Sequence, residues 1–175
     1  MYDPEQDMEA RAQSSNLNEE LGQVQYVFSD KTGTLTCNVM QFSKFTAGLK
    51  SYGTGKKPKS PQESNVCFDD PEMLSILRDT SHPHNESLEK VVLLLSLCHT
   101  MIIDQEKGIF NAASPDELAL GYAAKQFGYV FTGYDADDNM TIENRHTSAV
   151  TKYKLLSVCD FTSTRKRMSV ILRDP

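Results

Sequence analysis

The hydrophobic period of the sequence changes at Gly128, and this change limits the folds that the chain can adopt. Before it, two apolar segments have helical length and spacing: residues 87–104, with Ser87 as the expected N-cap, and residues 114–128. After it, four segments alternate with period two and are separated by turn residues: 129–134, 140–144, 153–161 and 166–174. The sequence therefore predicts an antiparallel sheet packed against two helices.

The second of these helices carries its own start and stop signals. Ser114 is the expected N-cap, and Pro115 suits the first helical position because its missing N–H would be unpaired there anyway. Asp116 and Glu117 place negative charge at the positive end of the helix dipole. Gly128 follows as the residue that ends the helix.

Composition is that of an ordinary globular protein. The 175 residues are 39% hydrophobic and 24% charged, which suffices for a buried core. The net charge of −6 argues against a nucleic-acid partner, because phosphate-binding domains usually carry a basic excess. The four cysteines are scattered without a C-x-x-C pair and fit a reduced compartment. The longest apolar run, residues 91–97, is far shorter than the roughly 20 residues of a membrane helix.

An earlier apolar run, residues 24–28, ends in a polar segment that reads "SDKTGTLT". The pattern predicts a short strand followed by a glycine-containing turn, with Asp30 at the carboxyl end of the strand. Open α/β sheets bind ligands at that end, and a carboxylate there can attack a phosphoryl group. Lys31 would supply counter-charge, and Gly33 would let the backbone approach a phosphate. The same residue types are common in tight turns, so from these residues alone a plain turn remains an alternative.

The seven residues from Asp30 to Thr36 match the phosphorylation signature of the P-type ATPases at every position. The longer segment "SNLNEELGQVQYVFSDKTGTLTCNVMQF" resembles the type IV branch of that family, the phospholipid flippases. Two later blocks, "AASPDE" and "FTSTRKRMSV", resemble the same branch and follow in the same order. Cation pumps share the heptad but usually lack these neighbours.

The resemblance implies a role for particular residues. Asp30 would be the nucleophile that Mg-ATP phosphorylates to an aspartyl phosphate, with Lys31 and Thr32 contacting nucleotide or phosphate. Magnesium would be held by Asp30 and the main-chain oxygen of Thr32. Glu117 would lie near the adenine end of ATP, and Phe161 would stack on the adenine ring.

Several of these residues also have an ordinary interpretation. Glu117 would stabilise a helix start, and Phe161 would be a core residue of a strand. The basic run 165–167 would line the phosphate path or form a solvated face. Thr32 stands where haloacid-dehalogenase-type phosphatases carry a second aspartate. Because Thr32 has no proton that titrates near neutral pH, the resemblance implies a persistent aspartyl phosphate and disfavours a soluble phosphatase.

For the fold, the resemblance implies a mixed α/β and α+β architecture. Residues 1–20 would be a polar approach segment, residues 21–38 the start of a haloacid-dehalogenase-like phosphorylation domain, and residues 39–175 a partial nucleotide-binding domain with an antiparallel sheet and flanking helices. Residues 53–71 would form a linker or loop within it.

For function, the resemblance implies an ATP-driven, multi-pass membrane enzyme with this segment on the cytoplasmic side. It would move phospholipid toward the cytoplasmic leaflet together with an accessory subunit. The family's later blocks "KGAD", "TGDK" and "GDGxND" do not occur in the chain, so we expect a fragment that alone neither turns over ATP nor forms phosphoenzyme. The alternative is a non-catalytic nucleotide-binding or interaction module derived from such a pump.

Overall fold

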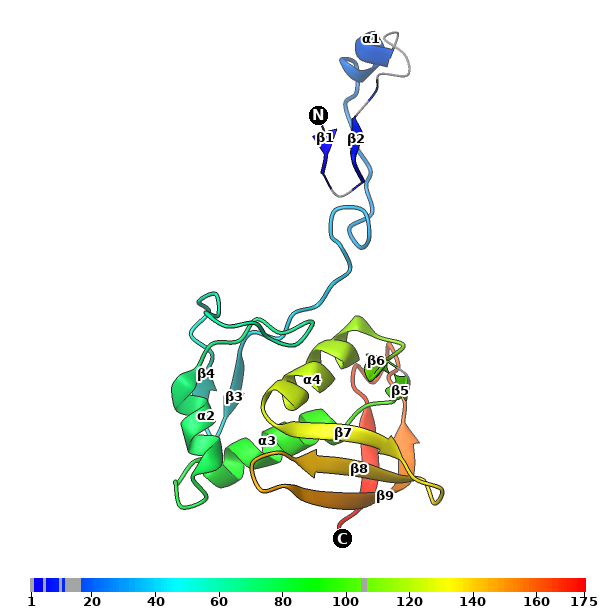
Figure 1. Ribbon diagram of the computed structural model, residues 1–175. Coiled ribbons are helices and arrows are strands. Elements are labelled where there is room, and N and C mark those ends of the chain that lie inside the picture. The colour runs from blue at the N-terminus through cyan, green and yellow to red at the C-terminus, as the bar shows by residue number, and fades with distance from the viewer. Residues whose placement is uncertain (1, 5, 10, 12–16, 105–106) are drawn as a thin grey trace. The chain divides into compact units, whose positions relative to one another are not determined.

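The computed structural model describes residues 2–4, 6–9, 11, 17–104 and 107–175. The chain divides into two units, Met1–Cys37 and Asn38–Pro175. Figure 1 labels the elements of the larger unit, which are, in chain order, β3 (Phe45–Ala47), β4 (Lys50–Tyr52), α2 (Pro71–Arg78), α3 (Asn85–Leu97), β5 (Ile102–Asp104), β6 (Ile109–Asn111), α4 (Pro115–Gln126), β7 (Tyr129–Tyr134), β8 (Asn139–Asn144), β9 (Ala149–Cys159) and β10 (Ser169–Arg173). Within the described residues, no helix is both long enough and apolar enough to cross a bilayer.

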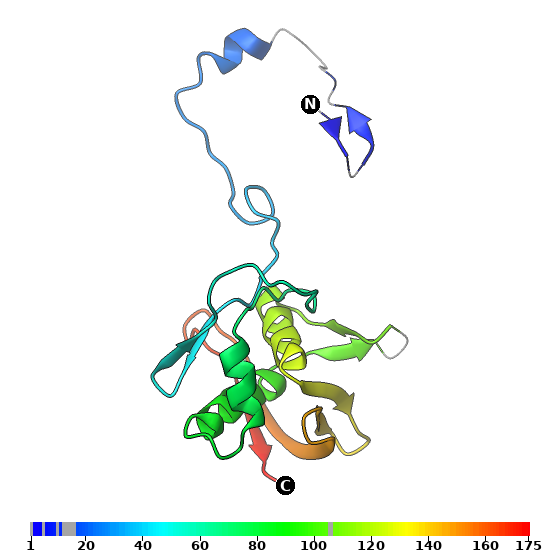
Figure 2. The same ribbon diagram turned by 60° about the vertical axis from the view of Figure 1, so that its left-hand side comes forward.

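The main sheet has the strand order β10-β9-β8-β7, and every neighbouring pair is antiparallel. Helices α3 and α4 pack against one face of it, as Figures 1 and 2 show. On that face the strands alternate as their period predicts: Met140 and Ile142 are buried, whereas Thr141 between them is half-buried. The predicted antiparallel sheet against two helices is therefore confirmed.

Helix α4 also confirms its sequence signals. The Ser114 hydroxyl accepts a hydrogen bond from the Asp116 backbone N–H at 3.1 Å, and Pro115 opens the helix. The helix ends at Gln126, and Gly128 just beyond it has a φ of +92°, a value that glycine adopts without strain.

Helix α3 has a different start from the one expected. It begins at Asn85 with His84 as N-cap, so the expected cap, Ser87, lies inside the first turn. The buried Asn85 side chain donates to the carbonyl oxygens of Ile76 and Leu77, at 3.0 and 3.1 Å. These bonds tie the start of α3 to the end of α2. The tertiary partner, rather than a serine cap, therefore decides where the helix begins.

Helix α2 was missed in the sequence although its start signal is present. Asp70 precedes Pro71, and its carboxylate accepts from the Met73 backbone N–H at 2.9 Å. The segment before it, residues 53–71, includes buried Val66 and Phe68, which are 7% and 3% exposed. It packs into the core of the larger unit.

Aromatic rings from β3, β4 and neighbouring loops form one part of that core. The Phe68 and Phe127 rings meet edge to face with centroids 4.9 Å apart, and Phe45 stacks on Tyr52 at 5.3 Å. Phe42 joins them through an edge contact with Phe127 at 5.7 Å. Such offset and edge-to-face pairs add to the stabilisation from buried area.

The unit Met1–Cys37 contains β1 (Tyr2–Asp3), β2 (Met8–Glu9) and α1 (Leu17–Leu21) among its described residues. The prediction of a strand over residues 24–28 is wrong, because these residues form neither helix nor strand. Val27 and Phe28 are 83% and 95% exposed. A strand needs a neighbour for its backbone hydrogen bonds and a surface to cover. The described part of this unit pairs β1 with β2 and otherwise forms only an isolated bridge between Thr32 and Thr36.

Candidate functional site

The residues from Asp30 to Thr36 form a turn that is held by local hydrogen bonds. The Lys31 carbonyl oxygen accepts from the backbone N–H groups of Leu35 and Thr36, at 2.9 and 3.1 Å. The Thr36 hydroxyl donates to the same oxygen at 3.3 Å. Gly33 has a φ of +79°, which the turn requires and other residue types resist. The heptad therefore folds into a compact turn without a sheet.

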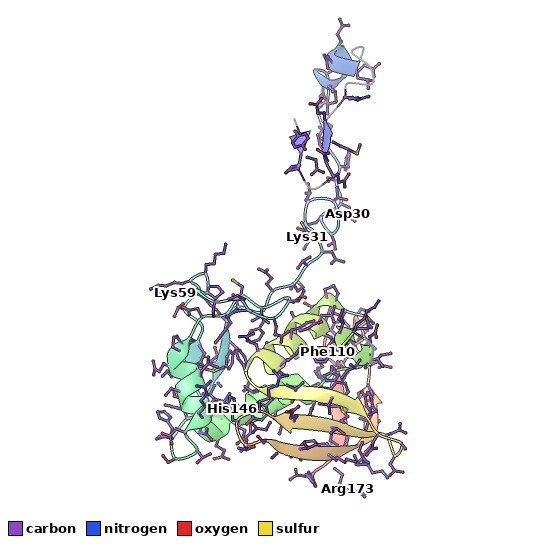
Figure 3. The ribbon with its side chains drawn as sticks, in the orientation of Figure 1. Asp30, Lys31, Lys59, Phe110, His146 and Arg173 are labelled. Carbon is purple, nitrogen blue, oxygen red and sulfur yellow. The ribbon has the colours of Figure 1, made fainter. Side chains whose placement is uncertain are left out.

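Asp30 stands at the start of this turn and is exposed (Figure 3). Its Oδ1 accepts from the Lys31 backbone N–H at 2.7 Å, and the Ser29 hydroxyl donates to the Asp30 carbonyl oxygen at 3.1 Å. The expectation that Asp30 ends a buried strand is wrong, because no strand precedes it. The carboxylate is open to a solvent-borne reactant, and its orientation rests on neighbouring residues of the chain.

A cavity in the larger unit brings together two predicted site residues from different elements. It has a volume of about 510 Å³ and lies among the end of α3, the first turn of α4 and the β9–β10 connection. Glu117 and Phe161 both line it. The remaining lining residues are Cys98, Ser114, Asp116, Leu120 and Met168.

Glu117 has a structural partner in this cavity. Its Oε2 accepts from the backbone N–H and the hydroxyl of Thr100, each at 3.1 Å. These bonds join the first turn of α4 to the segment after α3, and the negative charge suits the helix start. Glu117 therefore both stabilises the start of α4 and lines the cavity.

Phe161 is 62% exposed and does not belong to the core. The alternative that it is a buried strand residue is wrong, since β9 ends at Cys159 and Phe161 lies in the connection to β10. Together with Leu120 and Met168 it gives the cavity an apolar lining. An exposed aromatic face of this kind can stack on a nucleobase, which is typically worth about 1 to 3 kcal/mol per base.

Some lining residues were not anticipated from the sequence. Leu120 could have been found, because it lies one helical turn after Glu117 and so shares its face of α4. Cys98 caps the C-terminus of α3, and burial raises the pKa of its thiol. No local pattern marks Cys98, since only the packing of α3 beside α4 brings it to the cavity.

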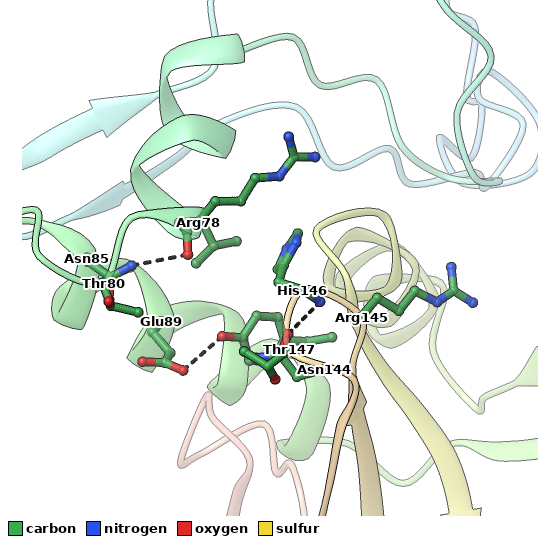
Figure 4. Close-up of a pocket in the computed structure, with 10 residues that line it drawn as sticks. Arg78, Thr80, Asn85, Glu89, Asn144, Arg145, His146 and Thr147 are labelled. Carbon is green, nitrogen blue, oxygen red and sulfur yellow. Dashed lines mark hydrogen bonds between the residues drawn. The ribbon is translucent and has the colours of Figure 1, made fainter.

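A second cavity, of about 430 Å³, lies between the α2–α3 region and the β8–β9 turn (Figure 4). Its polar groups bond largely to one another. The Tyr129 hydroxyl donates to Glu89 at 2.9 Å, and the His146 backbone N–H donates to Asn144 Oδ1, also at 2.9 Å. Burial raises the pKa of Tyr129, and the bond to Glu89 raises it further. The first bond joins the start of β7 to α3, and the second lies within the β8–β9 turn.

The oxygen donors that the resemblance implies for magnesium lie in the turn from Asp30 to Thr36. Among the described residues, no group of three or more His, Cys, Asp or Glu side chains could hold a metal by itself. The exposed Asp30 carboxylate and Thr32 main-chain oxygen are nevertheless hard donors of the type that Mg²⁺ prefers. Because Mg²⁺ commonly takes one or two protein oxygens plus substrate phosphates and waters, the donor set fits an ion shared with a nucleotide.

Comparison with known proteins gives matches along the whole chain. Human phospholipid-transporting ATPase IK is 37% identical over 192 residues, which cover 100% of this chain and 14% of the relative. Phospholipid-transporting ATPase IC of Xenopus tropicalis is 39% identical over 187 residues, with 100% and 15% covered. Mouse phospholipid-transporting ATPase FetA is 41% identical over 193 residues, with 100% and 16% covered.

The chain belongs to the phospholipid-transporting ATPase family. No protein-family model matches it. The chain spans between 14% and 16% of the length of these relatives. Within this member of the family, the Asp30 turn belongs to the unit Met1–Cys37 and the cavity with Glu117 to the unit Asn38–Pro175.

Proposed function

We propose that the chain is the part of an ATP-driven phospholipid pump that binds adenine nucleotide and carries the phosphoryl acceptor. What supports nucleotide binding is that Glu117 and Phe161 line one cavity of about 510 Å³. The proposed transported substrate, phospholipid, is inferred from the names of the relatives. The direction of lipid movement, toward the cytoplasmic leaflet, and an accessory subunit belong to the same proposal for the intact protein.

In the proposed complex, the adenine ring stacks on the exposed face of Phe161. Leu120 and Met168 exclude water from the ring, and the Glu117 carboxylate accepts a hydrogen bond from the exocyclic amine. An aromatic ring can stack on any nucleobase, whereas a carboxylate acceptor favours a base that carries an amino group. The combination therefore selects adenine over hypoxanthine, which lacks that amine.

In the proposed reaction, a carboxylate oxygen of Asp30 attacks the γ-phosphorus of ATP. A bond forms between that oxygen and phosphorus, the bond from the γ-phosphorus to the β,γ-bridging oxygen breaks, and ADP leaves with the electron pair. Lys31 offsets negative charge, and the hydroxyl of Thr34 is available as a donor to phosphate oxygens. Magnesium, when held by Asp30 and the Thr32 main-chain oxygen, would neutralise phosphate charge. With threonine at position 32, no second carboxylate activates water, so the aspartyl phosphate persists.

Calorimetric titration of the chain with ADP tests the nucleotide site. We expect Phe161→Ala to lower the affinity by about 5- to 150-fold, because a lost aromatic stack costs about 1 to 3 kcal/mol. Phe28→Ala is the matched control, since Phe28 is also exposed but lies outside the cavity. Equal affinities of the wild type and Phe161→Ala, or no binding by the wild type, would refute the proposed site.

Labelled ATP and an acid quench test the phosphoryl acceptor. In a phospholipid-transporting ATPase that contains this segment, Asp30→Asn should abolish the acid-stable label. The chain of 175 residues alone should form no label, because its Asp30 carboxylate is exposed and lacks the preorganised donors that phosphoryl transfer needs. A label on the chain that Asp30→Asn removes would contradict that expectation, and a label on the intact protein that survives Asp30→Asn would contradict the assignment.

A further inference from the structure

The connection between β9 and β10 carries two lining residues of the cavity, Phe161 and Met168. It is an exposed loop, and an unrestrained loop would spread these side chains over many positions. Ordering a flexible side chain at the moment of binding lowers affinity, so a ligand site gains from a loop that is ordered beforehand. The restraint on this loop is therefore a determinant of the site.

Arg165 supplies that restraint. Its Nη1 donates to the carbonyl oxygens of Cys159 and Arg167, at 3.2 and 3.0 Å, and its Nη2 donates to the Ser169 hydroxyl at 2.6 Å. Cys159 is the last residue of β9, and Ser169, its direct partner across the sheet, is the first residue of β10. The guanidinium thus cross-links the entry of the loop to its exit.

Backbone contacts within the loop act in the same sense. The Arg165 N–H donates to the Thr162 hydroxyl at 3.1 Å, and the Lys166 N–H donates to the Thr162 carbonyl oxygen at 2.8 Å. They form a turn next to Phe161. Arg165 is accordingly fixed both through its backbone and through its side chain.

The chemistry of the side chain matters here. A guanidinium presents its donors in a rigid planar fork and can serve three acceptors at once, whereas a lysine ammonium offers a single compact centre on a flexible stem. The Arg167 side chain, two residues away, is exposed and donates from Nη1 to the Arg165 carbonyl oxygen at 3.1 Å, a contact within the loop. The two arginines carry the same charge but differ in what they hold together.

We propose that Arg165 is a positioning residue for the nucleotide cavity: it holds the β9–β10 connection in the conformation that presents Phe161 and Met168, without itself contacting the nucleotide. This inference rests on the proposed nucleotide site. The sequence predicts that the basic run 165–167 either lines a phosphate path or forms a solvated face. For Arg165 the proposal replaces both interpretations, because its side-chain donors bond to protein acceptors.

The test compares adenosine and ADP as ligands in calorimetric titrations of the chain. If Arg165 acts through the adenine-stacking ring, Arg165→Lys should weaken both ligands by the same factor, about tenfold, as for a lost stack. If Arg165 contacts phosphate, ADP should lose much more affinity than adenosine, and the proposal is overturned. Unchanged affinity for both ligands overturns it too.

A double-mutant cycle separates positioning from a general loss of structure. In the Phe161→Ala background, Arg165→Lys should change adenosine affinity by less than about twofold, because the side chain that it positions is already gone. Independent, additive losses would refute the proposal. Arg167→Lys is the matched control and should leave both affinities unchanged, while Ser169→Ala, which removes one acceptor, should cause a smaller loss than Arg165→Lys.

Folding is controlled by measuring every affinity well below the thermal unfolding midpoint of that variant. Arg165→Lys retains charge and most of the aliphatic stem, so it is the variant used, and Ser169→Ala gives a second, milder test of the same bracing contact. A wild-type chain that binds neither adenosine nor ADP would refute the proposed nucleotide site itself. Wild-type binding with an unaffected Arg165→Lys variant would refute only the positioning role.

Discussion

The turn at Asp30 and the cavity beside Glu117 are built from different kinds of contact. Every hydrogen bond described for the Asp30 turn joins residues between Ser29 and Thr36, so neighbours in sequence suffice to form it. The cavity needs α3, α4 and the β9–β10 connection, which only a packed core brings together. A motif can therefore be complete in sequence while its site lacks tertiary support, and a site can be formed in three dimensions from residues with no common motif.

The largest contrast between the two regions should be in stability. Leu88 of α3 is fully buried at 0% exposure, so Leu88→Ala leaves a cavity and should lower the free energy of unfolding by about 2 to 5 kcal/mol. Phe28 is 95% exposed, and Phe28→Ala should change it by less than about 0.5 kcal/mol. Urea unfolding followed by circular dichroism measures both. Equal losses would show that the Met1–Cys37 unit buries Phe28 in solution.

Glycine replacements sharpen the comparison, because both regions contain a glycine at positive φ. An added Cβ at Gly128 would lie 2.6 Å from His146 Nε2, so Gly128→Ala should cost about 1 to 3 kcal/mol of unfolding free energy. At Gly33 nothing lies within 4 Å of the added atom, and strain from φ of +79° is the only penalty. Gly33→Ala should disturb the amide signals of Leu35 and Thr36 in NMR spectra and leave the urea midpoint unchanged. A matching midpoint shift would contradict the independence of the turn.

Serine replacements test a smaller effect. Ser114 caps α4, and Ser114→Ala should destabilise the larger unit by about 1 kcal/mol. Ser29 makes one exposed hydrogen bond, to the Asp30 carbonyl oxygen, and Ser29→Ala should be neutral within about 0.5 kcal/mol. Thermal unfolding of the two variants compares them directly. Equal midpoints for both variants and the wild type would contradict the capping role of Ser114.

The smallest effect should be a pH-dependent one at Asp135, in the β7–β8 turn. Hydrogen bonds from the Asn139 side chain and backbone, and from Lys152, lower the pKa of this carboxyl group. The unfolded value is about 3.9, so the stabilisation is present above that pH and is lost as the pH falls through the lower folded value. Asp135→Asn should therefore be less stable than the wild type at pH 7, and the difference should shrink below about pH 4. A constant difference down to pH 2 would contradict this account.

Local signals in the sequence predicted a large part of the fold. Helix α4 and the alternating strands β7 to β10 were expected because capping residues and side-chain period act within a few residues. Helix α2 was not predicted although Asp70-Pro71 marks its start, because the segment 53–71 was interpreted as a linker or loop. The start of α3 at Asn85 was not predictable in this way, since its side chain bonds to the carbonyls of another helix.

The sequence predicted the residues of the cavity better than it predicted the structure around Asp30. The resemblance named Glu117 and Phe161, and the cavity contains both. Their assigned roles, like those of Asp30, Lys31 and Thr32, remain predictions. The prediction of a strand before Asp30 was wrong, because an apolar run becomes a strand only when another strand pairs with its backbone hydrogen-bonding groups.

The sequence by itself determined the family, the turn at Asp30 and the helix that begins at Pro115, because each is marked by short motifs whose residues are neighbours along the chain. Tertiary structure alone decided that Phe161 is exposed beside Glu117 and that Arg165 bonds to both ends of the β9–β10 connection. These features depend on which elements pack together and which donors then find acceptors. That information lies in contacts between residues far apart in sequence, and no local pattern of charge or hydrophobicity carries it.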